Sequence, residues 1–309
     1  MENSSESEKT EVIRRTYSHK LPGEHLYDDI LFFGYTPADV LDAVKDFEVR
    51  DDDVFIATYP KAGTTWLQEL TWLIMHDGNF EEAYQKPVYF RSPFLEFKDE
   101  VLNEIGLDIA AQLQPPRIIK SHLPVTLMPN QIQNRNCKTL VLFRNPKDVC
   151  VSYYHFYRAS SSFGNFRGSW EEFMYMFLDG YVDHGSWFEY TKGWWGRRED
   201  PNTMLVFYED LKRNLRMEVD KLCAFLGKPL PVPVREEIAR HCRFENMKQN
   251  PMTNHMDVYS IDSNISPLLR KGEVGDWKTI FTVAQSEQFD KFCTDELGHL
   301  DIPFRYTLH

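Results

Sequence analysis

Residues 59–66 read Y-P-K-A-G-T-T-W and bring a lysine, a glycine and two threonines together between an apolar run, 54–57, and a helix-like run, 67–74. A strand, a tight loop and a helix in this order offer unpaired N–H groups and a partial positive charge at the helix N-terminus. Gly63 lets the backbone approach an anion closely, Lys61 adds a full charge, and the threonines add hydroxyl donors. The pattern predicts an anion-binding loop.

This loop differs from the common nucleotide triphosphate loop, G-x-x-x-x-G-K-[ST], in which the lysine follows the second glycine and a Ser or Thr binds magnesium. Here Lys61 precedes the glycine, and Pro60 occupies the loop entrance. A plain turn between a strand and a helix, capped by the threonines, is the alternative interpretation.

Residues 270–278, R-K-G-E-V-G-D-W-K, form a second segment that could bind a phosphate. Arginine can bind a phosphate with two parallel hydrogen bonds, and lysine binds it as a point charge. Taken alone, the segment fits a solvated surface turn better than a phosphate site.

Four short apolar runs, at 54–57, 118–119, 139–143 and 204–207, are separated by amphipathic segments. This alternation predicts a parallel sheet covered by helices on both faces. Ligands of such sheets bind beyond the carboxyl ends of the strands. Five polar residues lie at or just after a predicted strand end, and we expect them to meet at one edge: Lys61, Lys120, His122, Arg144 and Tyr208.

The predicted fold class is therefore α/β, a single domain with a central parallel sheet flanked by helices. Residues 1–15 are polar and acidic, and we expect a mobile tail there, because they cannot bury enough apolar surface to offset ordering. The domain is expected to span residues 16–309.

Composition narrows the function classes. The 309 residues carry a net charge of −12, which argues against a general binder of nucleic acid or of anionic membranes. The five cysteines are scattered and include no C-x-x-C pair, so neither a zinc site nor a disulfide framework is indicated. Reduced thiols, no signal-peptide core and no apolar stretch of membrane-spanning length favour a cytoplasmic protein.

Together, residues 59–66 and 270–278 resemble the cytosolic sulfotransferases, in which Y-P-K-x-G-T-T-W and R-K-G-x-x-G-D-W-K bracket the donor 3′-phosphoadenosine 5′-phosphosulfate (PAPS). Residues 120–124, K-S-H-L-P, look like the family's catalytic K-[ST]-H-L-P, and 144–156 look like its 3′-phosphate segment. The resemblance runs from about Leu26 to Arg305 and implies a P-loop-like phosphosulfate-binding loop. The segment R-S-P-F-L-E-F, which begins at Arg91, looks somewhat like invertebrate members.

Sulfuryl transfer moves a charged group in line between two oxygens, so positioning and charge stabilisation dominate, as in phosphoryl transfer. His122 is the natural general base, because imidazole titrates near neutral pH and the acceptor must lose a proton. Lys61 and Lys120 can stabilise charge on the leaving and transferring oxygens, and no metal is then required. The resemblance implies that Ser152 restrains the lysine until the acceptor arrives. The predicted catalytic residues are His122, Lys61, Lys120 and Ser152.

The resemblance also implies the residues that bind the donor. Arg144 and Ser152 would bind its 3′-phosphate, while Trp66 and Phe244 would stack on its adenine. The full predicted set is Lys61, Ala62, Gly63, Thr64, Thr65, Trp66, Arg144, Ser152, Tyr208, Cys242, Phe244, Met247, Arg270, Lys271 and Gly272.

The chain departs from the family pattern in three of the positions near the donor. Ala62 replaces a serine that is often found there in the family, but the backbone N–H at this position can still serve. Cys242 and Arg243 stand where many members have Thr and Ser, which removes a hydroxyl and adds a cation close to the nucleotide.

For the acceptor, family resemblance points to aromatic walls beside His122. The predicted substrate-binding residues are Phe33, Phe94, Phe97, Lys120, Ser121, His122, Tyr153 and Phe156. An aromatic slot with one buried base suits flat hydrophobic alcohols and phenols. Core packing is the alternative interpretation for each of these aromatic side chains.

Residues 278–287 fit the family's dimer motif K-x-x-x-T-V-x-x-x-E, which predicts a homodimer through Lys278 to Glu287. The predicted partners are thus a small hydrophobic hydroxylated substrate and a second copy of the chain, with no nucleic acid and no membrane.

Three other functions stay open at this stage. A kinase or phosphotransferase is disfavoured by the missing G-x-x-x-x-G-K-[ST]. A non-catalytic binder is disfavoured by the intact lysines and histidine. Some insect members of the resembled family dehydrate retinol, in one interpretation through an unstable sulfate ester, and a chain of that kind would share every motif above.

Overall fold

The computed structural model describes residues 16–99, 104–255 and 260–308. The tail expected over residues 1–15 lies outside this part of the chain. No helix in the described ranges is long and apolar enough to cross a membrane.

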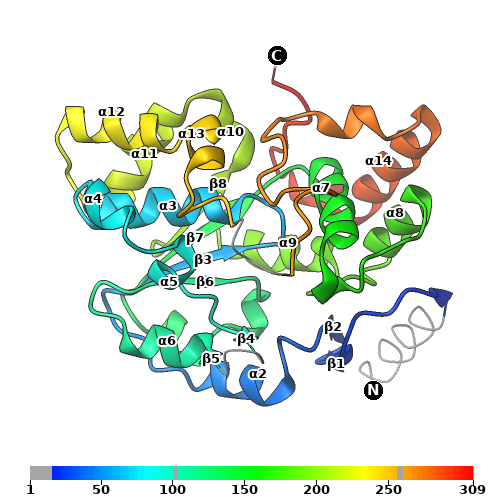
Figure 1. The fold of residues 1–309 in the computed structure, drawn as a ribbon, viewed down its shortest axis with the longest axis horizontal. Coiled ribbons are helices and arrows are strands. Elements are labelled where there is room, and N and C mark those ends of the chain that lie inside the picture. Colours follow the sequence, from blue (N-terminus) through cyan, green and yellow to red (C-terminus); the bar gives the residue numbers. More distant parts are fainter. Residues whose placement is uncertain (1–15, 100–103, 256–259, 309) are drawn as a thin grey trace.

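A parallel sheet of four strands forms the centre of the described fold (Figure 1). The strands are β3 (Val54–Thr58), β6 (Ile118–Ser121), β7 (Lys138–Phe143) and β8 (Thr203–Phe207), in the order β6-β3-β7-β8. Val54 pairs with Ile118 on one side and with Lys138 on the other, so all strands end near one edge. The predicted fold class is confirmed, and the four predicted apolar runs fall within these strands.

Helices cover both faces of this sheet, because all five residues of β3 are buried and successive side chains point to opposite faces. Val54 and Ile56 face a core formed with α3 (Thr64–Met75), α11 (Leu215–Phe225) and α12 (Val232–His241). Phe55 and Ala57 face the other core, which includes α7 (Pro146–Ala159), α8 (Trp170–Leu178) and α9 (Trp187–Trp195). Figure 1 shows the first helix group and α7 with α8 on opposite sides of the strands.

The remaining described elements surround this centre. They are β1 (His25–Tyr27), β2 (Ile30–Phe32), α2 (Ala38–Lys45), α4 (Phe80–Ala83), α5 (Val88–Arg91), β4 (Lys98–Asp99), β5 (Glu104–Ile105), α6 (Gly106–Gln112), η1 (Val125–Leu127), η2 (Asn130–Gln133), η3 (Ser161–Phe163), α10 (Tyr208–Arg213), α13 (Phe244–Gln249), η4 (Asp276–Thr279), α14 (Val283–Leu297) and η5 (Gly298–Leu300).

The start of α7 is fixed by its sequence. The Asn145 side chain caps the helix by accepting a hydrogen bond from the backbone N–H of Asp148 at 2.9 Å, and Pro146 follows at the first helical position. Asp148 in turn accepts hydrogen bonds from the backbone N–H groups of Gly275 and Trp277, at 2.8 and 2.9 Å. The segment 270–278 is thereby fixed against the end of β7.

Candidate active site

A cavity of about 490 Å³ lies at the carboxyl ends of the strands. The structure brings most of the predicted site residues to its wall: Phe33, Lys61, Gly63, Thr64, Thr65, Trp66, Phe94, Phe97, Lys120, His122, Arg144, Ser152, Phe156, Tyr208, Phe244, Met247, Arg270, Lys271 and Gly272. Segments that are far apart in the sequence therefore meet at the sheet edge that the strand pattern indicates.

The loop after β3 depends on a glycine. Gly63 has a φ of 117° and caps the N-terminus of α3. A Cβ at this position would lie 2.8 Å from the Tyr208 ring, which is closer than carbon atoms can pack. Glycine alone gives both this backbone conformation and this contact without strain. The first N–H groups of α3 therefore open onto the cavity beside Lys61 and Thr64.

Two lysines lie in the cavity against aromatic rings. Lys61 Nζ is 4.2 Å from the centre of the Phe156 ring, and Lys120 Nζ is 3.6 Å from that of Phe94. Desolvation, with help from nearby cations, lowers the pKa of Lys61 to about 7. Desolvation also lowers the pKa of Lys120 to about 8, against the opposite pull of the Glu96 carboxylate. Cations held so close together in a desolvated site favour an anionic ligand.

His122 is almost fully buried and its tautomer is set by its neighbours. Nδ1 lies 2.6 Å from the backbone carbonyl oxygen of Thr58, which can only accept a hydrogen bond. Nδ1 therefore carries the proton, and Nε2 is left as the basic atom. Desolvation, followed by the Lys120 charge, holds the pKa of His122 well below its usual value. The imidazole is thus neutral at physiological pH and can accept a proton.

Arg144 joins the loops that follow β3 and α13. Its guanidinium lies 4.2 Å from the centre of the Tyr208 ring, and it donates to the carbonyl oxygens of Lys61 and Glu273, at 3.2 and 3.0 Å. Its Nε is buried and has no hydrogen-bond partner in the described structure. Arg144 therefore still has a donor to offer to a bound anion.

Asp276 orders the two cations of the segment 270–278. Its carboxylate forms ion pairs with both Arg270 and Lys271. Gly272, which follows them, has a φ of 67°, and a Cβ there would lie 2.2 Å from the Phe244 ring. Gly272 is therefore required for the close approach of this segment to the Phe244 ring.

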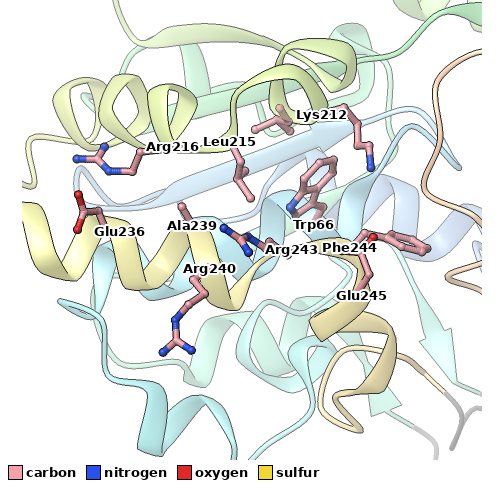
Figure 2. A pocket seen from close by; sticks show the side chains of 11 residues that line it. Trp66, Lys212, Leu215, Arg216, Glu236, Ala239, Arg240, Arg243, Phe244 and Glu245 are labelled. Atoms are coloured by element: carbon pink, nitrogen blue, oxygen red, sulfur yellow. The ribbon is translucent and has the colours of Figure 1, made fainter. Parts of the chain in front are cut away.

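Trp66 and Phe244 also border a second hollow of about 410 Å³, between α10 and α11 on one side and α12 and α13 on the other (Figure 2). Charged side chains of both signs line it, the cationic Lys212, Arg216, Arg240 and Arg243 and the acidic Glu236 and Glu245. Figure 2 shows the Arg243 side chain and the Phe244 ring pointing in different directions, so the cation that departs from the family pattern lines the hollow without facing that ring.

Another part of the cavity wall is aromatic. Phe94 stacks on Phe97 with 5.6 Å between ring centres, and Phe33 stacks on Phe163 at 4.9 Å. The Phe94 ring also meets His122 edge-on at 4.9 Å. This wall is apolar and lies directly beside the basic nitrogen.

Four predicted residues lie outside the cavity wall, namely Ala62, Ser121, Tyr153 and Cys242, each at most 1% exposed. The Ser121 hydroxyl accepts from the backbone N–H of Leu123 at 3.0 Å, and Tyr153 donates to the Asp183 carbonyl oxygen at 3.0 Å. These two side chains hold neighbouring segments in place. Cys242 packs in the core on the α3 face.

Several cavity residues have no sequence signal that would single them out. Asp183 and His184 line the wall, yet they follow no predicted strand, and Tyr35, Ile109 and Phe163 belong to segments without a motif. Glu96 accepts a hydrogen bond from the backbone N–H of His122. The only sequence signal near Glu96 is the likeness of residues 91–97 to invertebrate members of the family.

The described residues contain no group of three or more His, Cys, Asp and Glu side chains placed to hold a metal ion. The fold and the site define an α/β protein with an anion-binding site. Cationic and aromatic side chains line this site, and a neutral histidine lies within it.

Comparison with known proteins gives the family. The sulfotransferase domain model matches residues 51–301. Sulfotransferase 1A1 of Rattus norvegicus is 39% identical over 273 residues, which cover 88% of this chain and 93% of the rat protein. The chain therefore belongs to the sulfotransferase family and is a PAPS-dependent sulfotransferase, which confirms the resemblance.

Two solved structures agree with this assignment. Retinol dehydratase in complex with androsterone and inactive cofactor PAP aligns with a TM-score of 0.81 and 28% identity, over 90% of this chain and 89% of that one. Mouse sulfotransferase SULT7A1 complexed with PAP aligns with a TM-score of 0.73 and 29% identity, over 89% of this chain and 94% of that one. The likeness of residues 91–97 to invertebrate members stays a prediction.

Proposed function

We propose that the chain transfers the sulfuryl group of PAPS in line to a hydroxyl of a small hydrophobic acceptor, with His122 as general base. The observation that carries this proposal is the hydrogen bond from His122 Nδ1 to the Thr58 carbonyl oxygen, which leaves a neutral Nε2 in the cavity that Lys61 and Lys120 line. A base held neutral in this way can take the proton of an alcohol or phenol as the new bond to sulfur forms.

In this proposal the two lysines stabilise the transferring group. Lys61, in the loop between β3 and α3, is proposed to neutralise charge on the leaving phosphate oxygen. Lys120, which lies near His122 on the cavity wall, is proposed to face the sulfuryl oxygens. Ser152, on α7, also lines the cavity and is proposed to hold the lysine while the acceptor site is empty.

The donor is proposed to occupy the part of the cavity next to the loop after β3. The N–H groups that open α3 would bind its 5′-phosphosulfate. Arg144 and Arg270 would bind the 3′-phosphate, and support comes from the buried Nε atoms of both guanidiniums, which have no hydrogen-bond partner in the described structure. The adenine is proposed to lie between Trp66 and Phe244.

The acceptor is proposed to lie against the aromatic wall formed by Phe33, Phe94, Phe97 and Phe156. That wall suits a flat hydrophobic alcohol, phenol or sterol. The solved relatives support this size and polarity, because retinol dehydratase has been crystallised with retinol and with androsterone.

Two further parts of the proposal concern the whole chain. The segment Lys278–Glu287 is proposed to pair with itself in a homodimer, and Val283, 76% exposed within it, supplies an apolar contact. A cytosolic location is proposed on the likeness to the cytosolic sulfotransferases. The domain is still proposed to span residues 16–309.

Transfer of labelled sulfur from PAPS to phenols, sterols, retinoids and arylamines tests the proposed activity. The structural likeness to retinol dehydratase favours one second candidate, in which the sulfate ester of an allylic alcohol eliminates. Mass spectrometry of the products distinguishes the two, because the ester keeps the label while a dehydrated product has lost the elements of water. Tight binding of the product nucleotide without either product would contradict both activities for this panel.

A further inference from the structure

His184 lies on the cavity wall in a position that the surrounding structure fixes. It belongs to no helix or strand and has a φ of 65°, which is uncommon for a residue other than glycine and persists only where neighbours enforce it. Its backbone N–H donates to the Leu31 carbonyl oxygen at 2.9 Å, and its ring packs edge-on against Phe32. The orientation of its imidazole is therefore well determined.

Two carboxylates enclose this imidazole. Nδ1 lies 2.7 Å from Asp183 Oδ2, Nε2 lies 3.6 Å from Glu96 Oε1, and the three side chains are at most 2% exposed. Desolvation would lower the pKa of His184, but the charge and hydrogen bond of Asp183 and the nearby charge of Glu96 outweigh it and raise the pKa to about 9. His184 is thus held as an imidazolium between two buried carboxylates.

Glu96 connects this ion cluster to His122. The same Oε1 that faces His184 accepts a hydrogen bond of 2.6 Å from the backbone N–H of His122. The rings of His122 and His184 also meet edge-on, with 5.4 Å between their centres. A change at His184 would therefore reach His122 through the Glu96 hydrogen bond and through direct ring contact.

We propose that His184 is a positioning residue for His122: as a cation between Asp183 and Glu96, it holds the Glu96 carboxylate on the His122 backbone and keeps a positive charge beside the basic imidazole. The proposal rests on the proposed role of His122 as general base. The charge disfavours protonation of His122, and Lys120 and Lys61 act in the same direction. Glu96 is the carboxylate that faces both histidines.

The variant His184→Gln tests this role, because glutamine can still donate to a carboxylate but carries no charge. With saturating PAPS, we expect kcat to fall about 10- to 100-fold through misplacement of His122, while affinity for the product nucleotide stays within about twofold. The acid limb of the kcat/KM profile should move to higher pH. In NMR titrations of labelled imidazoles, the pKa of His122 should rise.

His241→Gln is the matched control. It removes another largely buried histidine–carboxylate pair, in which His241 Nε2 lies 2.9 Å from Glu69 Oε1, and neither residue lines the cavity. We expect this variant to lose stability without a change in kcat at saturating donor or in the pH profile. Such a result would separate positioning of His122 from a general loss of packing.

A folded His184→Gln protein with unchanged kcat and an unchanged His122 titration would overturn the proposal. If that variant does not fold, Glu96→Gln replaces it, since its amide oxygen still accepts from the His122 N–H while the charge facing His184 is lost. The value of kcat is again expected to fall, but the pKa of His122 should fall rather than rise, because a negative charge is removed while His184 still pairs with Asp183. An unchanged kcat together with an unchanged His122 titration would again overturn the proposal. If the wild-type protein transfers sulfur to no acceptor, the proposed function fails, but the NMR titration still decides whether His184 controls His122.

Discussion

The carbonyl oxygen of Thr58 and Nδ1 of His122 lie 2.6 Å apart because β3 and β6 are parallel neighbours in register. Ala57 is paired with Ser121, so the next residue of each strand emerges side by side at the sheet edge. The protonated nitrogen of His122 is thus chosen by the backbone of the adjacent strand, and the sheet itself leaves Nε2 as the base.

Gly63→Ala tests the loop after β3. The substitution adds a Cβ 2.8 Å from the Tyr208 ring at a φ of 117°, so we expect a loss of about 1–3 kcal/mol in the free energy of unfolding, and weaker binding of the product nucleotide. Chemical denaturation and calorimetry measure the two effects. Gly227→Ala is the control, because Gly227 has a φ of 67° with nothing within 4 Å of the added carbon. If both variants bound nucleotide like wild type, the loop would not form the phosphate site.

Arg270→Ala tests the proposed 3′-phosphate site. We expect the variant to lose about 1.5–3 kcal/mol of binding free energy for 3′-phosphoadenosine 5′-phosphate, the cost of a charge-assisted hydrogen bond. Adenosine 5′-phosphate, which has no 3′-phosphate, should lose far less. Calorimetric titration of both nucleotides into both proteins gives the comparison. An equal loss for the two nucleotides would place Arg270 elsewhere.

Nucleotide binding should weaken at alkaline pH. The pKa values of Lys61 and Lys120 are lowered to about 7 and about 8, so both side chains lose their charge in the free protein as pH rises through this range. Binding an anion above pH 8 must then take up protons, and affinity should fall by up to about tenfold per pH unit for each lysine that must be recharged. Calorimetry at pH 8.5 in buffers of different ionisation enthalpy counts these protons. Affinity that is flat between pH 7 and 9 would contradict the lowered values.

Val283→Asp tests the proposed dimer. Val283 is 76% exposed at the start of α14, so the substitution should leave the stability of the fold nearly unchanged. An acidic side chain placed near its own copy on a two-fold axis should dissociate the dimer. Light scattering at tens of micromolar protein measures the mass. A monomeric wild-type protein, or a variant that stays dimeric, would show that this segment is not the interface.

The fold could be predicted from the sequence because its signals are local. Each buried strand is a short apolar run followed by polar residues, and Lys61, Lys120 and Arg144 meet in the cavity because the ends of parallel strands share one edge. Tyr208 follows β8 by the same rule. Parallel strands bring their carboxyl ends to one edge whatever the exact register between them, so the register did not have to be known.

The rest of the site depends on packing between distant segments, which sequence patterns do not encode. His184 reaches His122 because a segment without regular structure, between α8 and α9, folds against the end of β6. Conversely, family resemblance predicts Tyr153 on the acceptor wall, whereas its ring is fully buried and its hydroxyl donates to the Asp183 carbonyl oxygen. The rotation of α7 about its axis decides which of its aromatic residues face the cavity, and Phe156 is the one that does.

The central claim, that a neutral His122 takes the acceptor's proton during sulfuryl transfer, is tested most directly by His122→Ala. The rate of label transfer from PAPS and the affinity for the product nucleotide would be measured together in the variant and the wild type. The account predicts that transfer falls to background while nucleotide affinity stays nearly unchanged, since the donor site lies on the other loops. Substantial turnover in the variant would contradict the assignment of His122 as the base.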